Sequence, residues 1–246
     1  MNKSIVLGLL LLMPGLATAS GGGVHLEQAH VNVQNQASLQ NGAKLFVNYC
    51  LSCHSARFMR YSRLARDLGL TEEQVKENLM FIGEKLGDTM TVNMPTEDSK
   101  RWFGTPPPDL SVIARSRGPD WLYTYMKTFY VDASRPFGAN NAVFPDVGMP
   151  HVMWELEGLK RPVFETHVDA DGKEVKSIVG YEMVQPGKLS PLDYDAAVAD
   201  LVNFLVYLGE PGQFDRKRIG LAVLLFLGLL AVLSYYLKKE YWKDVH

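Results

Sequence analysis

The chain is poor in cysteine, and this scarcity limits what it can be. Cys50 and Cys53 are its two cysteines among 246 residues. If one cofactor uses both thiols, none remains for a disulfide. A structural zinc site needs four ligands, and no second Cys/His cluster lies near these two cysteines. The sequence therefore offers neither a disulfide framework nor a complete set of zinc ligands.

Two further absences narrow the class of protein to which the chain can belong. The formal net charge is only −2, so the chain lacks the basic excess of a nucleic-acid-binding protein. It also has no internal repeat and no long low-complexity tract. The part between the two apolar ends, residues 20–213, has the size of one ordinary domain. We expect one folded domain and no nucleic-acid partner.

The run Cys50-Leu51-Ser52-Cys53-His54 is the most informative motif that is present. Two thiols with this spacing, followed directly by histidine, are typical of covalent haem attachment. The two sulfurs add to the two vinyl groups of a haem, and the next residue places an imidazole under the iron. The motif predicts one haem c held by Cys50 and Cys53, with His54 as the proximal iron ligand.

Two other interpretations of the same cysteines exist. A Cys-x-x-Cys pair is also found in redox-active dithiols and as half of a zinc site. A dithiol motif is expected near a strand–helix unit, which this region lacks. The zinc interpretation requires ligands that the neighbourhood does not supply. Haem attachment is the favoured interpretation.

The first nineteen residues have the pattern of a secretory signal peptide. Lys3 supplies the positive charge, an apolar run follows over residues 5–12, and Ala17-Thr18-Ala19 is an A-x-A-like cleavage site. The run is too short to cross a bilayer core of about 30 Å. We predict a signal peptide at residues 1–19, cleaved after Ala19; the alternative is an uncleaved anchor.

A second apolar run, residues 219–237, contains no charged residue and is long enough to span a membrane. Basic residues flank it on both sides, so the positive-inside rule does not decide its orientation. The signal peptide does, because it directs the domain after it across the membrane. We predict an exported haem domain at residues 20–213, a transmembrane anchor at 214–238 and a cytoplasmic tail at 239–246.

Helical periodicity dominates the exported domain. Ser38 is the expected N-cap of a first helix that carries the haem motif, and Thr71 to Gln74 resembles a capping box. Asp120 is expected to cap a helix beginning at Trp121, and Asp193 or Asp195 a helix that ends near Leu208. Residues 162–186 alternate apolar and polar side chains around a glycine-containing turn, which predicts a β-hairpin. Asp169 and Asp171 in that turn only weakly resemble a calcium loop.

The predicted haem needs a sixth ligand if it is to carry electrons without binding small molecules. Met149 lies in a constrained loop, and a thioether sulfur favours ferrous iron. Most methionines, however, simply fill the core. The competing residues for this position are Met90, Met94, His151 and Met153. Trp121, Tyr123 and Tyr125 are candidates for the wall of the haem site, although core packing explains each of them equally well.

The order of several motifs closely resembles the cytochrome c1 family, from about Ser38 to Tyr236. These motifs are the haem site, Pro107-Pro108-Asp109-Leu110-Ser111, Ser116-Arg117-Gly118, Phe144-Pro145 with Gly148-Met149, Glu210-Pro211, and the basic run at 215–220 that opens the anchor. The haem motif alone is shared by all c-type cytochromes. The basic run before a C-terminal anchor and the distant methionine are more specific.

The resemblance implies a fold that is mainly α: a c-type cytochrome haem domain with a small β-hairpin insertion and one C-terminal transmembrane helix. It implies that Met149 is the distal haem ligand and that Arg117 lies near a haem propionate, where a guanidinium pairs well with a carboxylate. The hairpin at 162–186 and the short tail differ from mitochondrial members and point to a proteobacterial form. The resemblance thus implies a bacterial inner membrane with the haem domain on its periplasmic side.

The resemblance also implies a role. The haem would accept an electron from the Rieske iron–sulfur protein and pass it to a cytochrome c, within a dimeric quinol–cytochrome c reductase that contains a cytochrome b subunit and is surrounded by membrane lipid. No bond-making chemistry, and so no catalytic residue, is expected. The alternatives are another membrane-anchored cytochrome c shuttle or oxidase subunit, and a haem sensor or peroxidase with an open sixth position.

Overall fold

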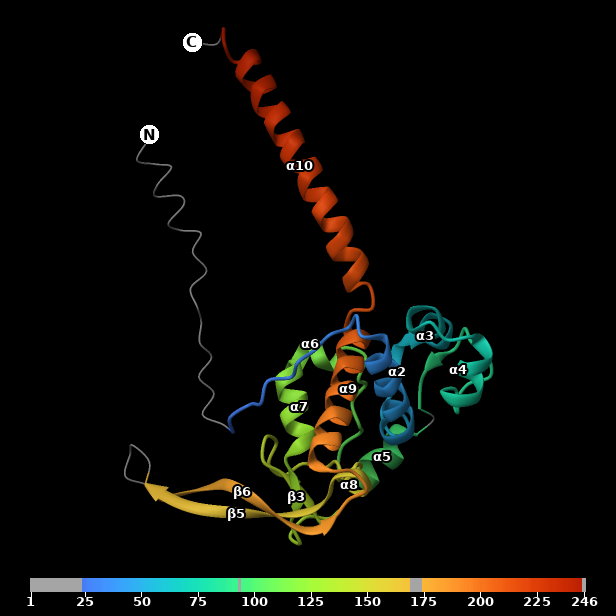
Figure 1. The fold of residues 1–246 in the computed structure, drawn as a ribbon, viewed down its shortest axis with the longest axis vertical. Helices are drawn as coiled ribbons and strands as arrows, with labels where there is room; N and C mark the ends of the chain where they lie inside the picture. The colour runs from blue at the N-terminus through green and yellow to red at the C-terminus, as the bar shows by residue number, and fades with distance from the viewer. Residues whose placement is uncertain (1–23, 93, 169–173, 245–246) are drawn as a thin grey trace.

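The computed structural model describes residues 24–92, 94–168 and 174–244. The predicted signal peptide at 1–19 and the hairpin turn at 169–173 lie outside the described residues. The described chain forms a helical domain, a long two-stranded hairpin at one end of it, and a single helix that projects from the opposite end (Figure 1). The predicted architecture, mainly α with a hairpin insertion and one C-terminal membrane helix, is confirmed.

Helix α9 (Pro191–Gly209) is the centre of the domain. It packs against α2 (Gln36–Leu45), α6 (Ile113–Arg117) and α7 (Pro119–Lys127), as Figure 1 shows. The apolar stripe that the sequence predicted on α9 is buried: Val198, Leu201, Val202, Leu205 and Leu208. Burying such a stripe removes apolar surface from water and is the main stabilising term for this bundle.

Gly42 allows α2 and α9 to approach closely. A Cβ atom placed on Gly42 would lie 2.1 Å from the backbone oxygen of Asp200 and 2.6 Å from the Cβ of Phe204. Neither atom can move without moving α9. The contact between the two helices therefore requires glycine at position 42. Glycine within a helix lowers its stability relative to alanine, but a larger residue here would push α2 and α9 apart.

Replacing Gly42 with alanine should destabilise the domain by about 3 kcal/mol, the upper end of ordinary overpacking costs, because the added methyl group meets a helix backbone. Denaturant unfolding of the detergent-solubilised chain measures this loss. Gly87→Ala is the matched control, since nothing lies within 4 Å of a Cβ at that exposed position. Equal stability of the two variants would contradict the close-approach argument.

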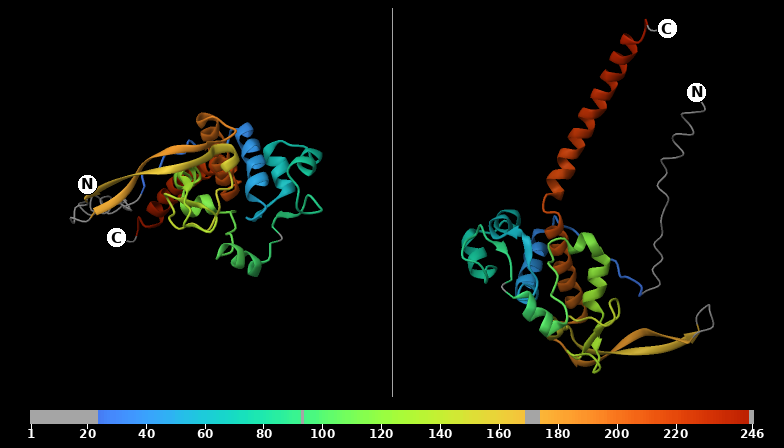
Figure 2. Two further views of the ribbon diagram at one scale, coloured as in Figure 1. Left: turned by 90° about the horizontal axis from the view of Figure 1, so that it is seen from below. Right: turned by 180° about the vertical axis from the view of Figure 1, so that it is seen from behind.

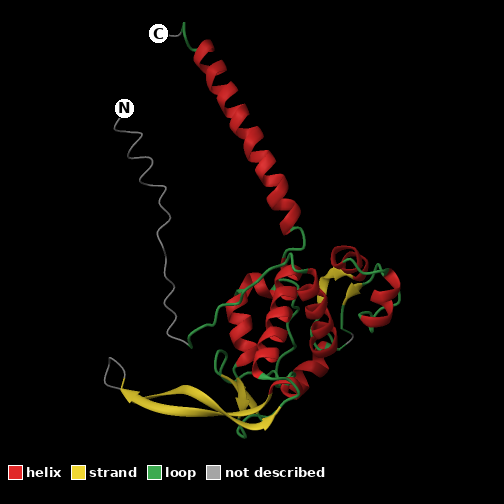
Figure 3. Cartoon of the chain, in the orientation of Figure 1, coloured by secondary structure: helices red, strands yellow, loops and turns green. Residues whose placement is uncertain are grey.

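The remaining elements surround the bundle (Figure 3). Short strands pair antiparallel in two places: β1 (Ala56–Arg60) with β2 (Thr89–Met90), and β3 (Phe129–Val131) with β4 (Ala139–Asn141). The connecting helices are α3 (Tyr61–Leu68), α4 (Glu72–Asn78), α5 (Thr96–Phe103) and α8 (Trp154–Glu157). Loops join these elements, and they carry Cys53, His54 and Met149.

The predicted hairpin is confirmed and is longer than predicted. Strands β5 (Gly158–Val168) and β6 (Glu174–Pro186) pair antiparallel from Gly158 opposite Pro186 to Val168 opposite Glu174. The hairpin begins at the base of the domain, contacts β3, and extends beyond the helices (Figure 2). The candidate calcium residues Asp169 and Asp171 lie outside the described residues.

Helix α10 (Gln213–Tyr241) stands apart from the domain. Within its segment Asp215–Tyr241, an apolar stretch of 18 residues has a mean hydropathy of 2.3, and none of that stretch is buried by the rest of the described chain. An apolar helix of this length that no protein surface covers is suited to the hydrocarbon core of a membrane. The expected membrane helix is confirmed.

The capping box at Thr71 is confirmed, because the Thr71 hydroxyl accepts from the Gln74 amide and the Gln74 side chain accepts from the Thr71 amide. The predicted cap at Ser38 is wrong. Helix α2 begins earlier, and Asn35 caps it by accepting a hydrogen bond from the Ser38 amide. Asparagine is as good an N-cap as serine, so residue type alone did not distinguish the two.

The predicted caps of α7 and α9 are also wrong. Gly118 precedes α7, with Pro119 in its first turn, and Asp120 instead accepts a hydrogen bond from the Ala29 amide at 2.8 Å. Ser190 caps α9 by accepting from the Asp193 amide. In both helices proline occupies the first turn, where its missing N–H costs nothing. Asp120 thus fixes the N-terminal segment to α7, a long-range role that a capping pattern does not reveal.

Candidate haem-binding site

The haem motif lies where the first helix ends. Helix α2 continues into a π-helical turn, η1 (Phe46–Cys50), in which the Leu51 amide donates to the Phe46 carbonyl. The amides of Cys53 and His54 then both donate to the Cys50 carbonyl, at 3.0 and 2.8 Å. Single π-helical turns are often found at functional sites. This one closes the helix and folds the five motif residues into one compact turn.

His54 is buried and oriented by the backbone. Its Nδ1 lies 2.7 Å from the carbonyl oxygen of Pro108, so Nδ1 carries the proton and donates to that oxygen. Burial lowers the pKa of the His54 imidazole, although the Pro108 carbonyl and Asp109 act in the opposite direction. The ring is therefore neutral, with Nε2 unprotonated and available. A second hydrogen bond that fixes the tautomer is typical of metal-ligating histidines.

The proline-rich segment that holds His54 is itself held against strand β1. Asp109 accepts from the Arg57 amide at 3.1 Å and from the Ser111 amide at 2.9 Å. Burial alone would raise the pKa of the Asp109 carboxyl, but hydrogen bonds from Ser111 and Arg57 lower it overall. The Ser111 hydroxyl accepts from the Phe58 amide. These bonds explain why the Pro-Pro-Asp-Leu-Ser motif follows the haem motif: it positions the Pro108 carbonyl.

The two thiols do not resemble a redox dithiol or a zinc site. Both cysteines are free. Burial, together with the neighbouring Cys53, raises the pKa of the Cys50 thiol to about 12, so Cys50 is not a ready thiolate. Within the described residues, no three His, Cys, Asp or Glu side chains are grouped so as to hold a metal ion. The two cysteines therefore fit covalent attachment of a haem better than they fit a redox-active dithiol or a zinc site.

Met149 is half-buried, and its sulfur accepts a hydrogen bond from the Tyr125 hydroxyl at 3.4 Å. Its neighbour Gly148 lies against the end of α5, because a Cβ there would be 2.9 Å from the Phe103 carbonyl oxygen. The chain from Phe103 to Pro108 is short, and its far end holds His54. The loop of Met149 and the haem motif therefore both contact the same short segment, residues 103–108.

Three of the four competing residues, Met90, His151 and Met153, are buried in contacts elsewhere. Met90 and Met153 are fully buried in the core, and Met90 pairs with Ala56 across β1 and β2. The His151 ring stacks on Phe129, with centroids 5.0 Å apart, and its Nε2 lies 2.9 Å from a Glu157 carboxylate oxygen. Met94 is half-buried. Met149 is half-buried, whereas Met90, His151 and Met153 are buried, and this favours Met149 over those three.

Arg117 is exposed at the end of α6, and its guanidinium lies over two aromatic rings. The Arg117 Cζ is 5.1 Å from the Trp121 centroid and 5.9 Å from that of Phe144. Within the described part of the chain, Arg117 has no carboxylate partner among the ion pairs. A guanidinium held by cation–π contacts but not neutralised is suited to an anionic group such as a propionate.

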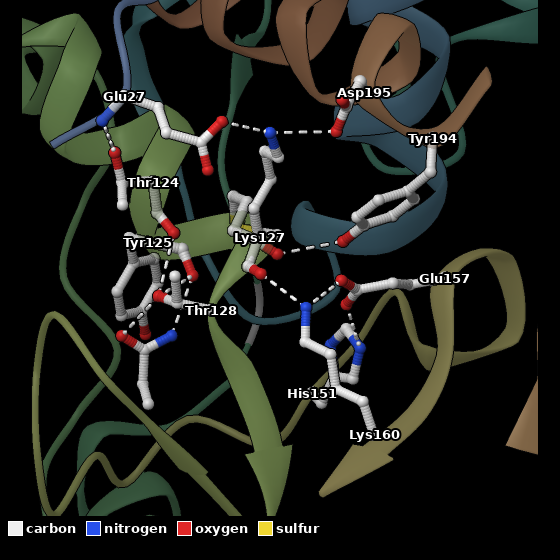
Figure 4. A network of polar contacts seen from close by, with 12 residues as sticks. Glu27, Thr124, Tyr125, Lys127, Thr128, His151, Glu157, Lys160, Tyr194 and Asp195 are labelled. Carbon is white, nitrogen blue, oxygen red and sulfur yellow. Dashed lines mark hydrogen bonds and ion pairs between the residues drawn. The ribbon is translucent and has the colours of Figure 1, made fainter. Parts of the chain in front are cut away.

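A buried charge network supports this end of the domain (Figure 4). The Lys160 ammonium, from β5, contacts the Glu157 carboxylate and the Lys127 backbone carbonyl at the end of α7. The Lys127 side chain pairs with Glu27 and with Asp195 of α9. The network joins α7, α9, the N-terminal segment and the hairpin next to the loop of His151, and so limits movement of the chain that follows Met149.

Replacing Lys160 with methionine should destabilise the domain by about 3–5 kcal/mol, because Glu157 would keep a buried charge without its main partner. Thermal or denaturant unfolding measures this. Lys188→Met is the matched control: Lys188 pairs with Glu155, but both side chains are exposed, so the loss should stay below about 1 kcal/mol. Similar losses in the two variants would show that the buried pair is not important for stability.

Two contributions to the site were missed from the sequence. The sequence gives only a weak indication that the Pro108 carbonyl contacts His54: a run of prolines is extended, so its carbonyls have no partners within a helix. Tyr125 was a candidate for the wall of the site, as were Trp121 and Tyr123, but its hydrogen bond to Met149 was not foreseen. The two residues are on different elements, and no local pattern relates them.

The chain resembles known proteins over almost its whole length. The model of the Cytochrome C1 family matches residues 27–245. The cytochrome c1 of Allochromatium vinosum is 52% identical over 246 residues, the full length of both chains. A protein of Nitrosomonas europaea named ammonia monooxygenase gamma subunit is 46% identical over 237 residues, 96% of each chain. The cytochrome c1 of Rhodospirillum rubrum is 27% identical, covering 98% of this chain and 96% of its own.

The family match covers the haem motif, the loop of Met149 and the apolar helix α10. The chain therefore belongs to the cytochrome c1 family, and it is a c-type haem cytochrome with one C-terminal transmembrane helix.

Proposed function

We propose that this chain binds one haem c covalently and relays single electrons within a cytochrome bc1 complex, from the Rieske iron–sulfur protein to a cytochrome c. The observation that carries the proposal is the hydrogen bond between His54 Nδ1 and the Pro108 carbonyl, which leaves a neutral, oriented imidazole beside two free thiols. When bound, the haem supplies a reversible one-electron iron couple.

Each residue has a separate task. Cys50 and Cys53 would hold the haem through thioether bonds, and His54 and Met149 would ligate its iron. Arg117 pairs with a propionate, because its guanidinium is exposed and without a carboxylate partner within the described residues. None of these residues acts as a general acid, base or nucleophile. The protein's contribution is to set the potential through ligation and burial.

The topology follows from the two apolar ends. Residues 1–19 are removed as a signal peptide, residues 20–213 form a periplasmic domain, the segment at 214–238 crosses the inner membrane, and residues 239–246 remain in the cytoplasm. The projection of α10 from one end of the domain supports this arrangement, since the domain then lies on one side of the bilayer. The partners in the dimeric complex are cytochrome b and the Rieske protein.

The relative named ammonia monooxygenase gamma subunit suggests a second possible assembly, in which a chain of this kind serves a different enzyme. A free, membrane-anchored electron shuttle is a third. All three assemblies use the same haem site, so the site alone does not select between them. The higher identity to a cytochrome c1 over the whole chain favours the bc1 complex.

Purification of the chain in mild detergent, with a tag at its C-terminus, tests the assembly. We expect cytochrome b and a Rieske protein to co-purify, and quinol to reduce the haem c of this chain. Removal of the Rieske protein should abolish that reduction while leaving chemical reduction by dithionite intact. Two outcomes would contradict the proposal. The chain could co-purify with monooxygenase subunits, or it could purify alone with a haem whose reduction does not depend on quinol.

A further inference from the structure

We infer that Tyr125 is a positioning residue for Met149: its hydroxyl fixes the orientation of the thioether sulfur and reduces the electron density that the sulfur donates to iron. This inference rests on the proposed role of Met149 as the distal ligand. It adds a residue that sets the potential of the site without touching the iron.

The contact is direct and buried. The Tyr125 hydroxyl lies 3.4 Å from the Met149 sulfur, and the Tyr125 residue is 8% exposed. An ordinary phenol keeps its proton near neutral pH, so the Tyr125 hydroxyl acts as the donor in this contact. A buried hydroxyl without an acceptor costs about 1–3 kcal/mol. The methionine sulfur is therefore an acceptor that this phenol needs.

The ring of Tyr125 is held on both sides. Trp121 stacks on it with centroids 4.8 Å apart and an interplanar angle of 11°. Phe129 meets it edge-on at 5.0 Å and 69°. At the backbone, the Tyr125 carbonyl accepts from the Asn141 side chain at 2.7 Å. The phenol cannot swing away to another acceptor without disrupting these contacts, so the hydroxyl remains directed at Met149.

The chemistry of a thioether explains the effect. Its sulfur has two lone pairs, so one can accept from Tyr125 while the other is donated to iron. The hydrogen bond withdraws electron density from the sulfur. Ferric iron depends on ligand donation more than ferrous iron does, so the hydrogen bond favours the reduced state. Hydrogen bonds near the ligands are an established means of tuning a haem.

Another buried phenol provides a matched control. Tyr194 is 3% exposed, and its hydroxyl donates to the Met126 carbonyl at 2.9 Å. Tyr194→Phe also removes a buried phenolic hydroxyl, but that hydroxyl bonds to backbone, not to a methionine sulfur. A general loss of stability should appear in both Phe variants. A change in the iron couple should appear only in Tyr125→Phe.

The experiment is a redox titration of the haem-loaded, full-length chain and its variants in detergent, with the methionine–iron charge-transfer absorbance recorded for each. Tyr125→Phe should retain the covalent haem but lower the potential. The preference for the reduced state should fall two- to tenfold, and tenfold corresponds to about 59 mV for one electron. The charge-transfer band should shift or weaken. Tyr194→Phe should leave the potential and the band unchanged.

Met149→Leu separates this inference from the proposed function. If Met149→Leu lowers the potential and removes the band while Tyr125→Phe matches the wild type, the ligand assignment is right and the role of Tyr125 is wrong. If Met149→Leu changes neither, the ligand assignment itself fails. In the Met149→Leu background, adding Tyr125→Phe should cause no further shift in potential, because the acceptor is gone. A full additional shift would show that Tyr125 acts by another route.

Discussion

Replacing both Cys50 and Cys53 with alanine should abolish covalent haem attachment completely. The sequence contains no other thiol, so no second route to a thioether bond exists. Peroxidase staining of haem after denaturing electrophoresis measures this directly, because only covalently held haem remains on the denatured chain. We expect a strong band for the wild type and none for the double variant, at equal amounts of protein.

Ser52→Ala is the matched control for the double cysteine variant. Ser52 lies between the two cysteines, is exposed, and its hydroxyl is 3.8 Å from the Cys53 sulfur. The variant changes the motif without removing a thiol, so haem staining should remain near the wild-type level. Staining that persists in the double cysteine variant would contradict thioether attachment. A single variant, Cys50→Ala or Cys53→Ala, should retain one bond and give weaker staining.

The features that the sequence predicted well are those that a local pattern encodes. The Cys50–His54 motif, the apolar helix α10 and the alternating hairpin are contiguous stretches, and the structure confirms the helix and the hairpin. The Thr71 capping box was predictable for the same reason, because both of its members lie within one turn. Contiguous patterns determine element type because hydrophobic periodicity and capping act over a few residues.

The features that were missed depend on contacts between distant segments. Asp120 has the residue type of a cap, but its carboxylate is taken by the Ala29 amide, far away in the chain. Likewise, Tyr125 and Met149 meet only because α7 and a long loop fold together, and His54 is oriented by a carbonyl from another loop. Periodicity carries no information about such pairs, so the structure was needed to find them.

Met149→Leu should lower the reduction potential of the bound haem by on the order of 0.2 V, a part of the roughly 0.8 V range that axial ligands span. Leucine keeps most of the side-chain volume but has no donor atom, so the iron loses a soft ligand that favours its ferrous state. The open sixth position should then bind carbon monoxide rapidly. Redox titration measures the first effect, and the reduced spectrum with and without carbon monoxide measures the second.

The competing candidates make this prediction specific. Met153 is fully buried, so Met153→Leu should cost stability through packing but leave the potential and carbon monoxide binding unchanged. His151 is stacked on Phe129 and faces Glu157, and it would have to break both contacts to replace the lost sulfur. If Met149→Leu retains the wild-type potential while Met153→Leu or His151→Ala loses it, the distal ligand is one of those residues. Rapid carbon monoxide binding by the wild type would show that the sixth position is open, which would favour a sensor over ligation by Met149.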